Sequence, residues 1–509
     1  MRINPLLHGV LISLIAVTPA SAQDPLSAIE WMTESVDEGS LPNTILLEPP
    51  VSGGVTQPEI EVTPLEELVP PIGLVAASTT GLPVSLWRDS DPDTLERLIA
   101  STPVRDYPAM QALLYSLLLT EARPPADKET AEKLLLARLD RLMALGATDP
   151  AQALVRVAGP TETRDRFARW FDASLLIGDE ERSCAALIAE PRLAPDERAH
   201  IFCLIRRGDW RTAALLLETA HALDLFPAHE LALLDRFLNP EIFEGAPPLP
   251  APTDPDPLSF RLHESIGEPI PTAPLPRAFA NADLRDLAGW RAQVEAAERL
   301  TRVGALNPNR LLGLYSERQP AASGGVWDRV DAVQRLDNAL RLRNADAVSK
   351  TLPEAWAAMQ SVDLEVAFAD LFSDQLASVS LKAEAAELAW RVRLLSRDYA
   401  GAALAAPAGS NRFLSALAQG APLDLLAQNE LESAIAHGFR EDASHPVDLD
   451  SLLMDGELGE ALLRAMLLFS HGSRGNYQGL SNALAVLRDV GLEDTARRAA
   501  LQLLLLERA

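Results

Sequence analysis

Residues 178–220 read GDEERSCAALIAEPRLAPDERAHIFCLIRRGDWRTAALLLETA, and this stretch decides the expected fold. Its composition predicts helices over 181–189, 196–207 and 210–223. The turns between them contain proline or Gly-Asp, and such turns end one helix and cap the next. Short consecutive helices joined by tight turns are typical of antiparallel helix pairs in a stacked helical repeat.

The two cysteines of the chain, Cys184 and Cys203, lie on the first and second of these helices. The midpoint between them falls at 192–194, inside the connecting loop. Antiparallel helices place residues at equal distances from their turn side by side, so we expect a disulfide bond here. The alternative is a pair of separate buried thiols. We expect no metal site, because His200 is the one further ligand nearby and the spacing matches no zinc pattern.

Composition indicates an all-α protein. The chain has 509 residues, a length for which two or three domains are the prior expectation. Leu, Ala, Arg and Glu are abundant, whereas only 5 Tyr and 13 Phe occur and alternating β-branched runs are hard to find. Good helix formers without strand-like alternation favour helices. We therefore predict an all-α, irregular helical-repeat solenoid, right-handed and made of two halves.

The net charge of −27, from 72 acidic and 45 basic residues, restricts the class of partner. Such a charge repels phosphate backbones and anionic lipid surfaces, so nucleic acid is not an expected partner. A requirement for solubility and a cationic partner each account for the acidic balance, and the sequence leaves both open.

The first 22 residues have the features of a cleavable secretory signal. Arg2 precedes an apolar core at 10–17, and 20–22 form a small-residue cleavage site. A buried N-terminal helix is the alternative. No later run of 18 apolar residues occurs, so we expect a periplasmic protein with no integral membrane segment after signal cleavage. Export into an oxidising compartment would also favour the bridge between the two cysteines.

Two proline tracts divide the rest of the chain. Residues 23–81 are expected to form an acidic, proline-rich linker with one short helix at most, and 82–239 show helical periodicity. The second tract occupies 240–280, and periodicity returns over 281–509. Apolar residues between its prolines favour a strap laid over the surface rather than a disordered linker. The leucines at 503–506 are expected to be buried by preceding helices or to dock another subunit.

Three turns share a pattern in which an acidic turn precedes paired small residues. They are Gly208-Asp209-Trp210 with Ala213 and Ala214, Arg397-Asp398-Tyr399 with Ala402 and Ala403, and Gly178-Asp179 with Ala185 and Ala186. The pattern resembles tetratricopeptide-like repeats, in which small residues let paired helices approach closely and an aromatic residue fills the gap between repeats. The turns at 178 and 208 are 30 residues apart, so the repeats are irregular.

The chain also resembles the helical superhelix of periplasmic soluble lytic transglycosylases. It departs from those enzymes because no catalytic Glu-Ser motif is followed by a Gly-rich core domain. The nearest string, His263-Glu264-Ser265, lies in the proline-rich strap. The resemblance therefore implies a non-catalytic periplasmic interaction scaffold.

One loop has the composition of a binding site. Residues 314–329 combine aromatic and arginine side chains around a Ser-Gly-Gly turn, which is typical of interface anchors. The predicted binding residues are Tyr315, Arg318, Trp327 and Arg329. The alternative is that Trp327 covers the core face of the next helix. No H-E-x-x-H, G-x-S-x-G, Walker or G-x-G-x-x-G motif occurs, so we predict no catalytic residue, metal or cofactor.

These patterns predict a non-catalytic exported scaffold that binds a protein or peptide partner and serves cell-envelope assembly or maintenance. The alternative is a cell-wall (peptidoglycan) hydrolase or lytic enzyme with a site on a concave face. A scaffold would present a broad groove without converging titratable groups. A hydrolase would require two carboxylates at matched separation in one deep cleft.

Overall fold

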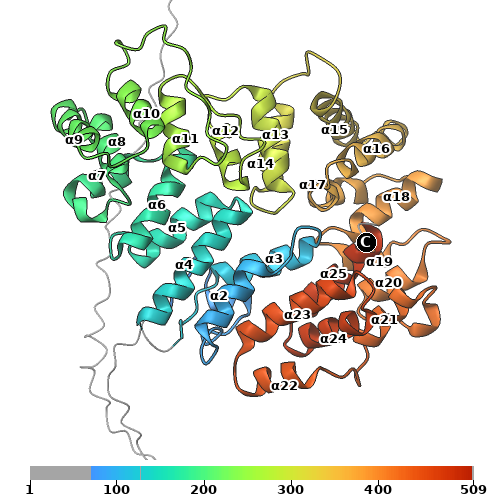
Figure 1. Ribbon diagram of the computed structural model, residues 1–509. Helices are drawn as coiled ribbons and strands as arrows, with labels where there is room; N and C mark the ends of the chain where they lie inside the picture. Colours follow the sequence, from blue (N-terminus) through green and yellow to red (C-terminus); the bar gives the residue numbers. More distant parts are fainter. Residues whose placement is uncertain (1–69, 126–127, 507–509) are drawn as a thin grey trace, which may run out of the picture. The chain divides into compact units, whose positions relative to one another are not determined.

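The computed structural model describes residues 70–125 and 128–506. Within these ranges the fold is all-α, contains no β-strand, and packs helices that are adjacent in sequence as pairs (Figure 1). No helix in the described part of the chain is both long and apolar enough to span a membrane. The predicted signal at 1–22 and most of the predicted linker at 23–81 lie outside the described residues.

The helices before the second proline tract are α1 (Ala77–Thr80), α2 (Pro92–Ser101), α3 (Pro108–Leu119), α4 (Lys128–Leu145), α5 (Thr148–Ala158), α6 (Arg164–Ile177), α7 (Glu181–Ala189), α8 (Glu197–Arg206), α9 (Trp210–Ala222) and α10 (Ala228–Leu238). Those within and after it are α11 (Pro257–Ser265), α12 (Ala280–Asp283), α13 (Trp290–Thr301), α14 (Pro308–Ser316), α15 (Val326–Arg341), α16 (Ala345–Gln360), α17 (Glu365–Ala377), α18 (Ala383–Leu394), α19 (Tyr399–Leu404), α20 (Arg412–Ala418), α21 (Glu430–Gly438), α22 (Val447–Met454), α23 (Leu458–Gly472), α24 (Tyr477–Asp489) and α25 (Glu493–Leu505). Short 3-10 turns are η2 (Pro191–Leu193), η3 (Arg277–Phe279) and η4 (Asp424–Leu426).

Two of the three helices in residues 178–220, α8 and α9, begin at capping side chains. Helix α7 has the predicted bounds, and α8 and α9 lie within one residue of theirs. Asp196 accepts a hydrogen bond from the Ala199 amide at 3.0 Å, and Asp209 accepts one from the Thr212 amide at 3.1 Å. Each carboxylate satisfies an amide that the first helical turn leaves without an intrahelical partner, and its charge is favourable at the positive end of the helix dipole.

Three of the six small residues of the repeated turn pattern are buried, and the aromatic residues of the pattern differ from each other in exposure. Ala213 and Ala402 are fully buried. Tyr399 is also buried, and its hydroxyl donates to Asp494 Oδ1 at 2.8 Å. Trp210 is 50% exposed, so the expectation that an aromatic residue fills the gap between repeats is wrong at this turn.

The second proline tract is irregular at first and then packs on the helices before it. Residues 246–256 contain no helix, after which α11 begins at Pro257, a position in the first turn that tolerates proline. Phe260 of α11 lies with Ile270, Leu275 and Phe279 in a small apolar cluster that includes Leu176 of α6. This part of the tract therefore contributes buried surface to the fold.

The end of the predicted linker also packs on the folded helices. The amides of Leu74 and Val75 donate to the Leu119 carbonyl at 2.8 and 3.0 Å. The buried guanidinium of Arg138 donates to the carbonyls of Leu118, Ile72 and Thr120. Three carbonyl acceptors satisfy a charged group that would be costly to bury alone.

The last helices pack against the first ones. Helix α25 contacts α3, and α23 contacts α2 (Figure 1). The Ala109 amide donates to Gln502 Oε1 at 2.7 Å, the Tyr107 and Ser473 hydroxyls share a hydrogen bond of 2.6 Å, and the Gly459 amide donates to a carbonyl that precedes α2. In an open solenoid each repeat contacts only its neighbours. Contacts between the first and last helices are not nearest-neighbour contacts. They extend one hydrophobic core over both predicted halves.

Candidate functional site

The four residues of the predicted binding loop have different surroundings. Tyr315 is 1% exposed, and its hydroxyl donates to Glu298 Oε1 at 2.7 Å. Arg329 also binds Glu298, through two hydrogen bonds of 2.9 and 2.6 Å. Burial, reinforced by the Glu298 charge, raises the pKa of Tyr315 well above its usual value. Tyr315 and Arg329 therefore join α13, α14 and α15 inside the fold, and Tyr315 has no surface to offer a partner.

The other two residues of this loop lie nearer the surface. Trp327 is half-buried and packs on Trp290, with ring centroids 4.7 Å apart. Arg318 is exposed and pairs with the adjacent Glu317. Trp327 thus packs on the first residue of α13, an earlier helix, and this contact does not decide between the two interpretations of the residue. The proposal that Arg318 and Trp327 bind a partner remains a prediction.

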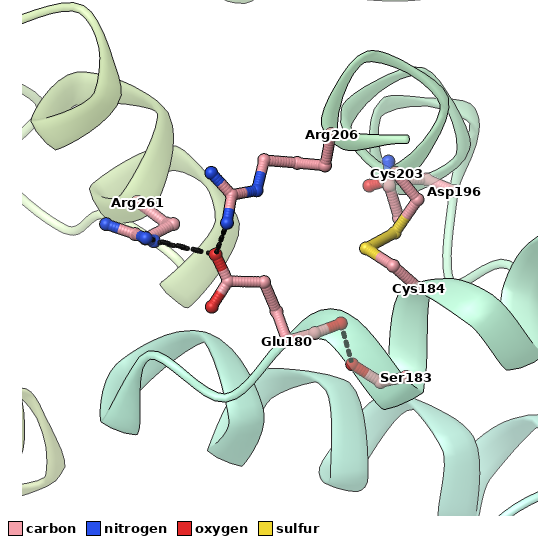
Figure 2. Close-up of a disulfide and its surroundings, with 8 residues drawn as sticks. Glu180, Ser183, Cys184, Asp196, Cys203, Arg206 and Arg261 are labelled. Carbon is pink, nitrogen blue, oxygen red and sulfur yellow. Dashed lines mark hydrogen bonds and ion pairs between the residues drawn. A yellow bond between two sulfur atoms is a disulfide. The ribbon is translucent and has the colours of Figure 1, made fainter. Parts of the chain in front are cut away.

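Cys184 and Cys203 form a disulfide between α7 and α8 (Figure 2). Their Cα atoms are 5.0 Å apart, within the range that a bridge requires. Both residues are buried, at 1% and 0% exposure, so solvent reductants have no direct access to the sulfur atoms.

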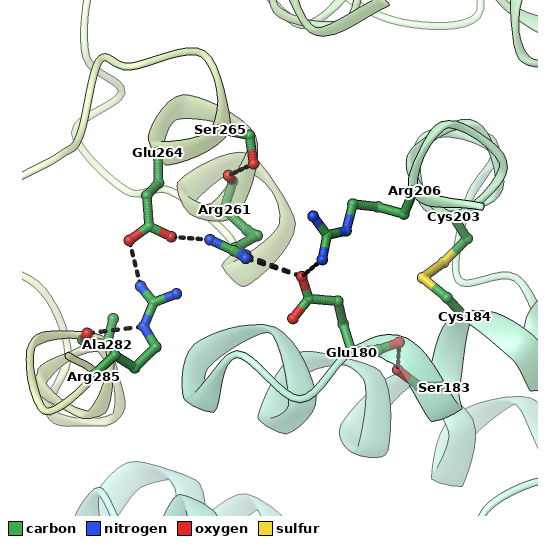
Figure 3. A network of polar contacts seen from close by, with 10 residues as sticks. All are labelled: Glu180, Ser183, Cys184, Cys203, Arg206, Arg261, Glu264, Ser265, Ala282 and Arg285. Atoms are coloured by element: carbon green, nitrogen blue, oxygen red, sulfur yellow. Dashed lines mark hydrogen bonds and ion pairs between the residues drawn. A yellow bond between two sulfur atoms is a disulfide. The ribbon is translucent and has the colours of Figure 1, made fainter. Parts of the chain in front are cut away.

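A chain of ion pairs starts beside the disulfide and reaches the second proline tract. Glu180, which precedes α7, is 2% exposed and accepts hydrogen bonds from Arg261 of α11 at 3.0 and 3.3 Å. Arg206 of α8 pairs with the same carboxylate oxygen at 3.2 Å (Figure 2). Arg261 also binds Glu264, which in turn binds Arg285 (Figure 3). Glu264, the centre of the His-Glu-Ser string, is therefore engaged by two arginines that fix α11 in place.

A second group of carboxylates surrounds Arg198. Its guanidinium pairs with Asp196 at 2.6 Å, Asp256 at 2.9 Å and Glu230 at 3.2 Å. Burial, followed by repulsion from Asp256, raises the pKa of Asp172 to about 7. This carboxyl therefore holds a proton in the folded protein at mildly acidic pH.

A cleft of about 380 Å³ lies where α3 and α25 meet helices from the middle of the chain. Its walls come from α3, the turn after α13, α17, the turn before α19, and α25. A neighbouring cavity of about 260 Å³ shares Asn307, Pro308, Asp370 and Arg397 with it, so the two form one continuous cleft. Ligand sites commonly have volumes of this order.

The wall between α3 and the turn after α13 is fixed by a close approach. The Tyr115 hydroxyl donates to the Val303 carbonyl at 3.0 Å, and burial raises the pKa of this tyrosine well above its usual value. Gly304 has φ +70°, and a Cβ atom there would lie 3.2 Å from the Tyr115 ring. Only glycine adopts this conformation without strain while leaving space for the ring.

The opposite wall is fixed by buried serines. The Ser373 hydroxyl of α17 and the Ser396 hydroxyl share a hydrogen bond of 2.9 Å, and the Asp398 amide donates to Ser396 at 3.2 Å. This ties the turn that carries Arg397 to the helix that carries Asp370. Asp370 and Arg397 are thereby held beside each other, although they belong to different elements.

The cleft contains charges of both signs. At one end Arg302 lies 3.7 Å from Asp363 and donates to the Val362 carbonyl at 2.8 Å. At the other end Asp370 faces Arg498 and Arg397. Asp370 is exposed to the cleft, but the surrounding walls desolvate its carboxylate and raise its pKa, and the charges of the two arginines lower the pKa without compensating fully.

Apolar side chains complete the lining, among them Ala112, Leu306, Leu364 and Val366. Such a surface can bind the side chains of a peptide while the charged groups orient its polar atoms. In the described ranges no group of three or more His, Cys, Asp or Glu side chains is placed to hold a metal ion.

Sequence reasoning missed the residues of this cleft. They come from segments almost 400 residues apart, between Pro108 and Arg498, so no local motif unites them. Arg397 belongs to a turn with a repeat-like pattern, and that pattern was informative about helix packing but not about ligand binding. Comparison with protein-family models, with characterised proteins and with solved structures gives no match to this chain.

Proposed function

We propose that this protein is an exported, non-catalytic scaffold that binds a segment of a protein or peptide in the cleft between α3, α17 and α25. The observation that carries the proposal is the cleft itself, which combines an apolar lining with arginine and aspartate side chains. Peptides present both side-chain surface and polar backbone, and this lining is complementary to both. The partner is expected to belong to the cell envelope.

The proposed compartment is the periplasm. A disulfide is typical of oxidising compartments, and the N-terminal residues have the pattern of a secretory signal. Fusion of residues 1–22 to alkaline phosphatase, which is active only after export, tests this part. Phosphatase activity that depends on the fused residues supports export, and its absence would refute it.

The helix pairs are proposed to be tetratricopeptide-like, related in design to the superhelix of soluble lytic transglycosylases. Support comes from the packing of consecutive helices and from the burial of Ala213, Ala402 and Ala403 in two of the repeated turns. Repeats of this kind commonly bind peptides or proteins through surfaces that many helices share.

The binding proposal is tested by filling the cleft. Ala112 is exposed on α3 and lines the cleft, so Ala112→Trp should occupy it without disturbing the core. Ala222→Trp, at an exposed position on α9, is the matched control. In-cell crosslinking followed by mass spectrometry should give peptide crosslinks around the cleft in the wild type and the control. Their persistence in Ala112→Trp would refute the cleft as the binding site.

The hydrolase alternative has one observation in its favour. Two carboxylates, Asp363 and Asp370, line the same cleft, and a raised pKa at Asp370 is a property of a general acid. Zymography of purified wild type and Asp370→Asn against peptidoglycan separates the hypotheses. Lysis by the wild type that disappears in Asp370→Asn would refute the scaffold hypothesis and support the hydrolase hypothesis.

A further inference from the structure

The positive charge of Arg397, at the Asp370 end of the cleft, is incompletely neutralised by the protein. Arg397 is exposed within the turn before α19, and in the described part of the chain no hydrogen bond or ion pair closes on its guanidinium. Asp370 is its electrostatic neighbour, and the same carboxylate also faces Arg498.

Arg498 is weakly paired as well. Its Nη1 lies 4.0 Å from Asp494, at the limit of an ion pair, and Asp494 already accepts a hydrogen bond from Tyr399. The Nε of Arg498 is buried and has no hydrogen-bond partner among the described residues. Two guanidinium groups thus share one carboxylate, Asp370, in a cleft that has room for a ligand.

Weakly paired guanidinium groups favour an oxyanion ligand. A carboxylate can accept two parallel N–H bonds from one arginine, and charge-assisted hydrogen bonds are stronger than neutral ones. A carboxylate is a stronger acceptor for a guanidinium than the water it replaces, because its hydrogen bonds are charge-assisted. The cleft therefore contains guanidinium donors for which a bound anion would supply the acceptors that the protein lacks.

The charge of the anion is limited by the surroundings. Asp363 lies in the same cavity, Asp374 and Asp398 line the adjoining one, and the whole chain carries a net charge of −27. A dianionic phosphate would meet repulsion from all of these groups, whereas a carboxylate carries only one charge.

We propose that Arg397 and Arg498 bind a carboxylate of the partner segment, either its C-terminal carboxylate or an acidic side chain. The inference rests on the proposed function and names the group by which that partner is recognised. Asp370 competes with the bound carboxylate for the two arginines and so limits its affinity.

The test uses full-length mature protein with its disulfide intact and three fluorescein-labelled pools of randomised hexapeptides. The first pool lacks Asp and Glu and has a free C-terminus. The second has the same composition and a C-terminal amide. The third is amidated and contains one Glu at a random position. Fluorescence polarisation measures the binding of each pool, and inorganic phosphate is added as a competitor.

The free-acid pool, the Glu-containing pool or both should bind, and the neutral amidated pool should bind about tenfold or more weakly. Arg397→Ala should weaken carboxylate binding by about tenfold, and Asp370→Asn should strengthen it several-fold. The matched control is Arg211→Ala, which removes one exposed arginine from α9. Opposite effects of two substitutions in one cleft would not arise from a general loss of structure.

The outcomes separate the two proposals. Equal binding of acid and amide pools, abolished by Ala112→Trp, would overturn the carboxylate assignment and leave peptide binding in the cleft intact. Unchanged affinity in Arg397→Ala, or displacement of the peptides by phosphate, would also overturn the assignment. Binding of none of the pools would overturn both proposals.

Discussion

Removal of the Glu180 carboxylate should destabilise the region where α7, α8 and α11 meet. Glu180 is 2% exposed and forms ion pairs with Arg261 and Arg206, which differ in burial. The side chain of Arg261 is 13% exposed, and that of Arg206 is 50% exposed. Loss of a partner from a buried ion pair typically costs about 3–5 kcal/mol, and exposed pairs contribute at most about 1 kcal/mol.

The expected costs follow from these burials. Because Arg261 keeps Glu264 as a second partner, Glu180→Ala should lower the free energy of unfolding by about 2–3 kcal/mol, below the usual range for a buried pair. Glu180→Gln keeps the shape but buries an amide without its charge, and should cost about 1–2 kcal/mol. Arg206→Ala should cost about 0.5 kcal/mol.

Urea denaturation followed by circular dichroism gives the global change, and peptide-resolved hydrogen exchange localises it to α7, α8 and α11. Glu181→Ala is the matched control, since Glu181 is the exposed neighbour in the first turn of α7 and should matter little. A cost for Arg206→Ala equal to that of Glu180→Ala would refute the argument from burial. A Glu180→Ala variant with an unchanged free energy of unfolding would also refute it.

Three further predictions test other parts of the fold. Replacing Cys184 and Cys203 by Ala opens a loop of 19 residues and should lower the free energy of unfolding by about 3 kcal/mol. Thiol titration should show that the native bridge resists dithiothreitol until urea unfolds the protein. The pKa of Asp172 is about 7 in the folded protein, above its unfolded value of 3.8, so this group makes the unfolding free energy fall as pH rises from about 4 to 7. Asp172→Asn should therefore stabilise the protein by on the order of 2–4 kcal/mol above pH 7 and by little below pH 4, and a pH-independent gain in urea titrations would contradict this. Gly304→Ala should lower the melting temperature more than Gly409→Ala, because both have positive φ but only the first meets a ring; equal shifts in calorimetry would remove the close approach as the reason.

Local elements were predictable because their causes are local. The bounds of α7 follow from a Gly-Asp turn before it and a proline after it, and helices α8 and α9 begin at aspartate caps that the sequence displays. The disulfide was predictable for the same reason, since the loop between paired helices fixes which residues face each other. Helix α11 was missed because the density of prolines around it hides a start at Pro257.

Interactions over long sequence separations were not predictable in this way. Tyr315 and Arg329 have the composition of interface anchors, but both side chains bind Glu298 inside the fold, Tyr315 through a hydrogen bond and Arg329 through an ion pair. Nothing in the local sequence marks Glu298 as their partner. The packing of α25 on α3 depends on complementary surfaces that are almost 400 residues apart, and the cleft depends on that packing.

The distance between the first and last helices tests the basis of the proposed site most directly. Arg105 and Arg474 are exposed and lie close to Tyr107 and Ser473, whose hydroxyls are 2.6 Å apart. Since the natural cysteines are bonded to each other, spin labels would attach only to cysteines introduced at 105 and 474. Pulsed electron paramagnetic resonance should then give one narrow distribution of short distances. A broad distribution, or one centred at long distances, would show that the two ends of the array do not pack together and that the cleft does not form.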